Sequence, residues 1–126
     1  MTKQEVFDRV IDQLIKQGGP SIDTDIGKCV YHRSDGRMCP GGVFIPKNMI
    51  SSSYENTPFN YLIGRLKPNK VELPGKEEIA LIKELQDAHD ESARHDLENA
   101  RKAFIAVGRE HNLSTRGVIS LKKWKM

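Results

Sequence analysis

The stretch from Cys29 to Cys39, CVYHRSDGRMC, places two thiols and a histidine around an Asp-Gly pair. Residues of these types can form a disulfide, supply half of a metal site or provide a thiol nucleophile. The same run also has the composition of a β-hairpin that carries no chemistry. The spacing of the residues decides among these alternatives.

Residues 34–36, Ser-Asp-Gly, suit a three-residue hairpin loop, a type I turn followed by a glycine in the left-handed region. In that register Tyr31 faces Cys39, and Cys29 lies diagonal to Cys39 on the same face. Diagonal partners are roughly 7–8 Å apart, beyond the roughly 4.4–6.8 Å Cα separation of most disulfides. With a two-residue loop the cysteines would point to opposite faces. We therefore expect two reduced thiols.

A metal site or a nucleophile in the hairpin is the weaker interpretation. Zinc sites built on tight turns use closely spaced cysteines, and a Cys-x9-Cys separation has no such pre-set geometry. A nucleophilic thiol needs a nearby base, and no paired base or Gly-rich nucleophile turn is visible in the sequence. We expect no catalytic residue and no cofactor. The weak metal-ligand candidates are Cys29, Cys39, His32 and His89.

The dipeptide His89-Asp90 is the second feature that can do chemistry. Metal-dependent His-Asp phosphohydrolases bring several histidines and aspartates onto one or two metal ions, so a metal-dependent hydrolase using these two residues stays an alternative. His89 follows Leu85 by one helical turn on an apolar stripe, while Asp90 turns outward. We favour a buried, hydrogen-bonded His89 that pins its helix to the hairpin.

The elements that must position these residues include three predicted helices. Apolar residues recur at helical spacing over about 3–17, 77–92 and 95–112. The first helix begins with a capping box at residues 2–5, Thr-x-x-Glu, and ends at Gly18.

The rest of the chain is assigned by turn residues and composition. At 126 residues the chain has the size of one domain. The expected segments are an N-terminal helix at 1–18, a hairpin at 29–46, an irregular region at 47–75 with one short helical or extended piece, two helices at 77–112, and a basic tail at 114–126 with a β-like core at 118–121. These segments predict a small α+β domain of about three main helices packed with a β-hairpin.

Charge is distributed unevenly along the chain. Residues 76–99 carry three bases against eight acids, a net charge of −5, whereas residues 114–126 carry four bases and no acid, a net charge of +4. An acidic helical segment beside a basic tail indicates an interaction surface, since nucleic-acid-binding domains are usually basic throughout. No apolar run approaches the roughly 20 residues that span a membrane, and the N-terminus has no pattern of a secretory signal.

The tail sequence LKKWKM allows four interpretations. Its lysines and Trp124 can bind a nucleic-acid backbone with one stacked base, lie on an anionic membrane surface, or dock in a partner's groove. Alternatively, Leu121 and Trp124 fold back onto the helices while Lys122 and Lys123 stay in solvent.

Several short motifs together resemble a family of small uncharacterised proteins encoded largely by tailed bacteriophages and related mobile elements. The motifs are Cys29-x-Tyr31, Asp35-Gly36, Cys39-x-x-Gly42, an apolar run ending at Pro46, and a helix with Leu85-Gln86 and His89-Asp90. The resemblance runs from the first helix to about Leu113. It departs at His32, where the family often has an arginine, and over residues 47–60.

The resemblance, the charge pattern and the lack of a complete catalytic constellation favour a non-enzymatic phage accessory protein. We expect it to bind and modulate a host protein in the host cytoplasm, as an inhibitor in host takeover or counter-defence. A nucleic-acid-binding module that uses the basic tail is the first alternative, and the metal-dependent hydrolase is the second. The expected contact residues are Arg33, Arg37, Tyr54, Lys122, Lys123 and Trp124.

Overall fold

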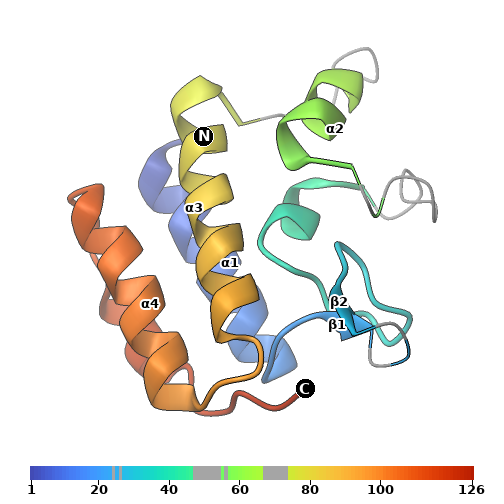
Figure 1. Cartoon of the computed structure of the whole chain (residues 1–126). Coiled ribbons are helices and arrows are strands. Elements are labelled where there is room, and N and C mark those ends of the chain that lie inside the picture. The colour runs from blue at the N-terminus through green and yellow to red at the C-terminus, as the bar shows by residue number, and fades with distance from the viewer. Residues whose placement is uncertain (24, 26, 47–54, 56, 67–73) are drawn as a thin grey trace.

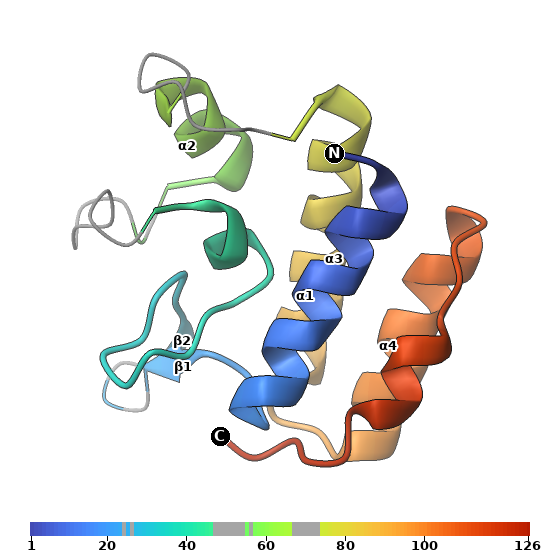
Figure 2. The ribbon, with the colours of Figure 1, turned by 180° about the vertical axis from the view of Figure 1, so that it is seen from behind.

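Three long helices form the body of the molecule. The computed structural model describes residues 1–23, 25, 27–46, 55, 57–66 and 74–126. Helices α1 (Lys3–Gln17), α3 (Lys76–Ser92) and α4 (Leu97–Glu110) lie alongside one another. Figures 1 and 2 show α4 on one side of α3, and the hairpin region with the short helix α2 (Phe59–Leu66) on the other.

Two short strands, β1 (Ile22–Asp23) and β2 (Lys28–Cys29), form one antiparallel pair. With the helices, they confirm the predicted α+β class of three main helices and a β-hairpin. None of the described helices is long and apolar enough to cross a membrane.

Helix α1 begins and ends as its sequence predicts. The Thr2 hydroxyl accepts a hydrogen bond from the Glu5 N–H (3.1 Å), and the Glu5 carboxylate accepts one from the Thr2 N–H (3.4 Å), which completes a capping box. Gly18 closes the helix with a φ of 73°, and its N–H donates to the Leu14 carbonyl. The apolar side of α1 is buried against α3 and consists of Val6, Phe7, Val10, Ile11 and Leu14.

Helices α3 and α4 form an antiparallel pair joined by a short turn. The Asp96 carboxylate caps α4 by accepting the Asn99 N–H (2.9 Å), and the chain leaves α4 near Asn112, whose φ is 57°. Both signals were readable in the sequence. The residues of this pair that pack into the core are Leu81, Ile82, Leu85, Ala88, Ala100, Phe104 and Val107.

The turn at residues 34–36 has the predicted register but little regular strand around it. Arg33 N–H donates to the Arg37 carbonyl (2.7 Å), and His32 pairs with Met38 in a single bridge. The regular pair β1–β2 lies upstream, and residues 41–44 form a 3₁₀ helix, η1 (Gly41–Phe44), where a strand was predicted. A Cβ at Gly42 would lie 2.0 Å from the Tyr31 carbonyl oxygen, so glycine lets the chain turn inward there.

The tail differs from its prediction in the same way. Residues 118–121 do not form a strand, because Arg116–Ser120 is a 3₁₀ helix, η4, that turns Val118 and Leu121 into the core against α1 and α4. The Arg101 guanidinium donates to the Leu121 and Ile119 carbonyls (2.7 and 3.2 Å). Val118 and Leu121 are both buried because a helical turn places residues three positions apart on the same side.

We expect Trp124→Ala to lower the free energy of unfolding by about 3–5 kcal/mol, as for other buried aromatic truncations. Trp124 is 8% exposed, packs edge-on against Phe104 (ring centroids 5.8 Å apart), and donates its indole N–H to the Ser92 carbonyl (2.7 Å). Chemical denaturation measures the loss. Ile119→Ala, at a side chain 69% exposed, is the control and should change stability by less than about 0.5 kcal/mol. Equal losses in the two variants would contradict the packing described here.

Candidate functional site

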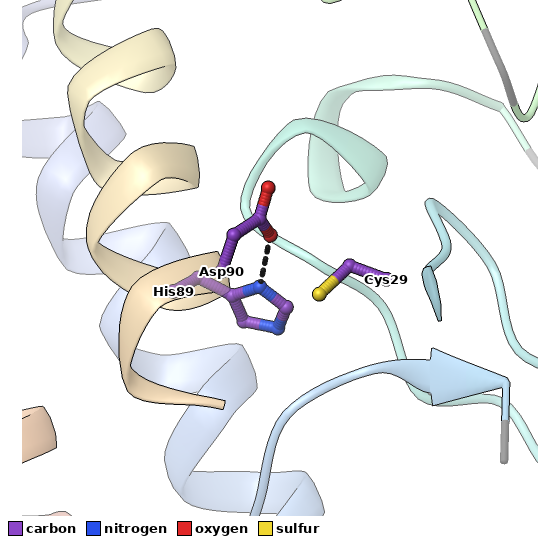
Figure 3. Close-up of side chains that lie close together, drawn as sticks. All are labelled: Cys29, His89 and Asp90. Carbon is purple, nitrogen blue, oxygen red and sulfur yellow. Dashed lines mark hydrogen bonds and ion pairs between the residues drawn. The ribbon is translucent and has the colours of Figure 1, made fainter. Parts of the chain in front are cut away.

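Cys29, His89 and Asp90 meet between β2 and the last turn of α3. One potential ligand atom from each lies within 4.8 Å of the other two. Figure 3 shows the thiol of Cys29 facing the imidazole and carboxylate of the adjacent helical pair. Two of these residues, Cys29 and His89, were metal-ligand candidates from the sequence. The other two candidates are not in this group, since His32 hydrogen-bonds the Gly42 carbonyl (2.8 Å) and Cys39 is buried in the core.

His89 is fully buried and hydrogen-bonded at both ring nitrogens. The Ser21 N–H donates to Nε2 (3.0 Å), and Nδ1 lies 2.9 Å from Asp90 Oδ1. Because Nε2 accepts a hydrogen bond, the proton of the neutral ring is on Nδ1 and is donated to Asp90. His89 is buried and hydrogen-bonded, as predicted, but it joins α3 to the segment that leads into β1 and not to the predicted hairpin at 29–46. Its ring also contacts Trp124 edge-on (6.0 Å between centroids).

Asp90 is exposed, as the sequence predicted, and one of its carboxylate oxygens also contacts this cluster. Its side chain is 45% exposed, and Oδ1 accepts hydrogen bonds from His89 Nδ1 and from Gln86 Nε2 (2.8 Å). Gln86 is held in turn by the Gly41 N–H, which donates to its side-chain oxygen (3.0 Å). Burial disfavours the ionised carboxylate, but hydrogen bonds from His89, Cys29 and Gln86 outweigh burial and lower the pKa of Asp90.

Both cysteines are free and protonated. Burial, followed by the charge and hydrogen bond of the neighbouring Asp90 carboxylate, raises the pKa of the Cys29 thiol to about 12. Complete burial likewise raises the pKa of Cys39. A thiol reacts as its thiolate, and His89 presents Cys29 with no free basic nitrogen. The cluster is therefore a hydrogen-bonded centre and lacks the arrangement of an activated nucleophile.

A cavity of about 250 Å³ opens beside the cluster. Glu55 lines part of the cavity, and its carboxylate accepts hydrogen bonds from the backbone N–H groups of Tyr31 (2.6 Å) and His32 (3.3 Å). The Tyr31 hydroxyl donates to the Thr57 carbonyl (2.6 Å). The described lining residues include two carboxylates and no lysine or arginine. They are Cys29, Tyr31, Cys39, Glu55, Thr57, Pro58, Gln86 and Asp90.

The cavity is lined by residues from two separate parts of the sequence. Cys29, Tyr31 and Cys39 come from the hairpin region, and Gln86 and Asp90 come from α3, more than 40 positions later in the chain. Sequence spacing alone did not place these two groups together.

Two participants in the site were not identified from the sequence. Glu55 lies in the segment read as irregular, with no pattern to single it out. Ser21 acts through its backbone N–H, which every residue except proline has, so no side-chain signal marks it.

The predicted contact residues Arg33 and Arg37 are held in place by Asp35 and by backbone carbonyls. Arg33 forms an ion pair with Asp35 (2.6 Å) and donates to the Ile22 carbonyl (3.2 Å). Arg37 lies 3.8 Å from the same carboxylate and donates to the carbonyls of Pro20 and Lys125. Both side chains are about one-fifth exposed, so each combines a structural role with a partly accessible charge.

The predicted contact residues of the tail divide into two groups. Trp124 is buried in the core, whereas Lys122 and Lys123 are exposed. Tyr54 lies outside the described residues.

Comparisons with protein-family models, with curated proteins and with solved structures give no match for this chain.

We expect Cys29 to alkylate slowly at pH 8 and Asp90→Asn to accelerate the reaction. The substitution removes the negative charge that helps to raise the pKa of the thiol, while burial, the larger cause, remains. Mass spectrometry after timed iodoacetamide treatment, with a chelator present, measures the rate. Cys39 serves as the internal reference because it is 1% exposed. An unchanged Cys29 rate in the variant would contradict the electrostatic coupling.

Acid should weaken the wild-type fold more than the fold of Asp90→Asn. The pKa of Asp90 is lowered from 3.8 in the folded state, so its carboxylate stabilises the fold above that value. This contribution is lost as the pH falls through the lower, folded-state pKa. Urea unfolding between about pH 7 and pH 2 should show the stability difference between the two proteins shrinking below about pH 4. Parallel curves would show that Asp90 contributes no net charge-dependent stability.

Proposed function

We propose that this protein is a non-catalytic phage accessory protein that binds an acidic surface of a host protein in the host cytoplasm. The supporting observation is that the hairpin turn and the C-terminal tail, almost 90 residues apart in sequence, meet through Arg37 and Lys125. Their exposed cations then lie on one side of the molecule.

Three contacts hold this arrangement together. The Arg37 guanidinium donates to the Lys125 carbonyl, and the Lys125 N–H donates to the Gly18 carbonyl (3.0 Å). A Cβ at Gly19 would lie 1.9 Å from the Lys125 carbonyl oxygen, so the tail approaches the end of α1 more closely than any other residue type allows. We call the cations gathered here the basic surface. They are Lys16, Arg33, Arg37, Lys123 and Lys125.

A groove between the end of α1 and the hairpin turn lies within the basic surface. It has a volume of about 310 Å³, and Lys16 and Arg37 line it together with Gln13, Gln17 and Met38. Asp35, which also lines the groove, is ion-paired with Arg33 and Arg37, and its hydrogen bond from Arg33 is the main cause that lowers its pKa. A carboxylate from a partner therefore meets the exposed Lys16 beside an acid whose charge is already compensated.

A protein partner fits this surface better than single-stranded nucleic acid. Binding of single strands relies on aromatic side chains that stack on bases. Trp124, the aromatic residue of the tail, is buried and its indole N–H is already bonded to Ser92. The lysines alone supply charge complementarity, which steers association with an acidic protein.

We expect the double variant Lys123→Glu/Lys125→Glu to lose at least about tenfold of its partner binding, because reversed charges repel an acidic surface. Tagged wild-type and variant proteins are incubated with nuclease-treated lysate of the bacterial host. Bound proteins are then quantified by mass spectrometry.

The matched control is Lys76→Glu/Lys83→Glu, which reverses two exposed lysines on α3 and changes the net charge equally. A partner that wild type and control retain and the tail variant loses supports the proposal. Equal retention by all three proteins overturns it, and so does salt-sensitive binding to generic DNA or RNA with no protein partner, which would indicate a nucleic-acid-binding module.

A further inference from the structure

The Cys29–His89–Asp90 cluster has the donor set of a zinc site. One thiol, one imidazole nitrogen and one carboxylate oxygen lie within 4.8 Å of one another, from two separate elements (Figure 3). Zinc binds such atoms at roughly 2.3 Å for sulfur and roughly 2.0–2.2 Å for nitrogen and oxygen, so the donors around it are roughly 3–4 Å apart. Nδ1 and Oδ1 are already 2.9 Å apart, and a small approach of Sγ completes the set.

We propose that Cys29, His89 and Asp90 bind a divalent cation of the zinc type, with a further coordination position open to the 250 Å³ cavity that Cys29 and Asp90 line. The soft thiolate selects zinc over magnesium or calcium, which prefer oxygen ligands. This site is distinct from the basic surface, so it stands or falls separately from the proposed partner binding.

The protons of the cluster balance when the metal enters. Without metal, one proton is on Sγ, one is on Nδ1, and Asp90 is ionised. Metal binding breaks the S–H bond and releases that proton to solvent, while the imidazole proton moves from Nδ1 to Nε2. The cation then bonds to a thiolate, a neutral imidazole and a carboxylate, and its two positive charges compensate their two negative charges.

The tautomer change has one structural consequence. Nε2 accepts the Ser21 N–H in the arrangement described here (3.0 Å), and a protonated Nε2 cannot do so. Metal binding therefore replaces this hydrogen bond with two buried N–H groups that face each other, which costs more than one lost hydrogen bond but less than the free energy with which structural zinc sites bind. The Ser21 amide thus reports on occupancy of the site without any activity assay.

Cobalt provides the first test, because a cobalt–thiolate bond gives a near-ultraviolet charge-transfer absorption. Titration of the chelator-treated wild-type protein with Co²⁺ should produce this band and saturate at one equivalent, and Zn²⁺ should displace it. Cys29→Ser should abolish the band. Cys39→Ala, which removes the other thiol, should retain it because Cys39 lies outside the cluster.

Three results would overturn the proposal. They are a wild-type protein that gives no band, a band that persists in Cys29→Ser, and a folded Cys39→Ala protein that has lost the band. Circular dichroism checks that each variant is folded.

Nuclear magnetic resonance of the wild-type protein gives a second test that does not depend on variants. Saturating Zn²⁺ should shift the Ser21 amide resonance and move the His89 ring proton from Nδ1 to Nε2. Resonances of Ser21 and His89 that stay unchanged at saturating Zn²⁺ would also overturn the proposal. Lys123→Glu/Lys125→Glu should bind the metal as the wild type does, which separates this result from the partner-binding test.

Discussion

The buried imidazole of His89 is the constraint on which the rest of the structure depends. Its Nε2 accepts a hydrogen bond from the Ser21 N–H, its Nδ1 is hydrogen-bonded to Asp90, and its ring packs edge-on against Trp124. One side chain of α3 therefore holds the segment before β1, the wall of the cavity and the C-terminal tail. A fully buried polar ring is tolerated only when each nitrogen has a partner, and here both do.

The position of the C-terminal tail depends on the contact between Trp124 and His89. Trp124 packs at the end of the α3–α4 pair where a short turn joins the two helices, and its indole N–H donates to the Ser92 carbonyl. The flanking Lys123 and Lys125 are exposed. With Trp124 anchored, Lys125 reaches both Gly18 and Arg37. The cations of the hairpin and of the tail thus share one surface because an aromatic residue between the lysines is buried.

The two candidate sites have different lining residues and depend on different interactions. The basic surface offers exposed charge on long side chains, which suits steering and recognition of an acidic partner. The Cys29–His89–Asp90 cluster offers converging donor atoms in a half-buried setting, where a carboxylate and a protonated thiol are held by directed hydrogen bonds. The ring of His89, a member of the cluster, contacts Trp124, which anchors the tail.

The sequence by itself determined the local structure. The Thr2–Glu5 capping box, Gly18 and the apolar stripes marked the three long helices, because these signals act within a few residues of chain. The turn at 34–36 set the hairpin register for the same reason. At residues 41–44 and 118–121 the sequence predicted strands, whereas the chain forms 3₁₀ helices. Contacts of these segments with the long helices favour the 3₁₀ conformation.

The tertiary structure alone decided which distant residues meet. Nothing in the spacing of Cys29 and His89 places their side chains together, and the hydrogen bonds of the exposed Asp90 to Gln86 and His89 were not predicted from the sequence. The sequence allowed Trp124 either to bind a partner or to pack into the core. In the structure it packs against Phe104 and His89 and donates a hydrogen bond to Ser92. Helix ends and turns are local properties of a chain, whereas sites assembled from separate elements exist only once the core has brought those elements into contact.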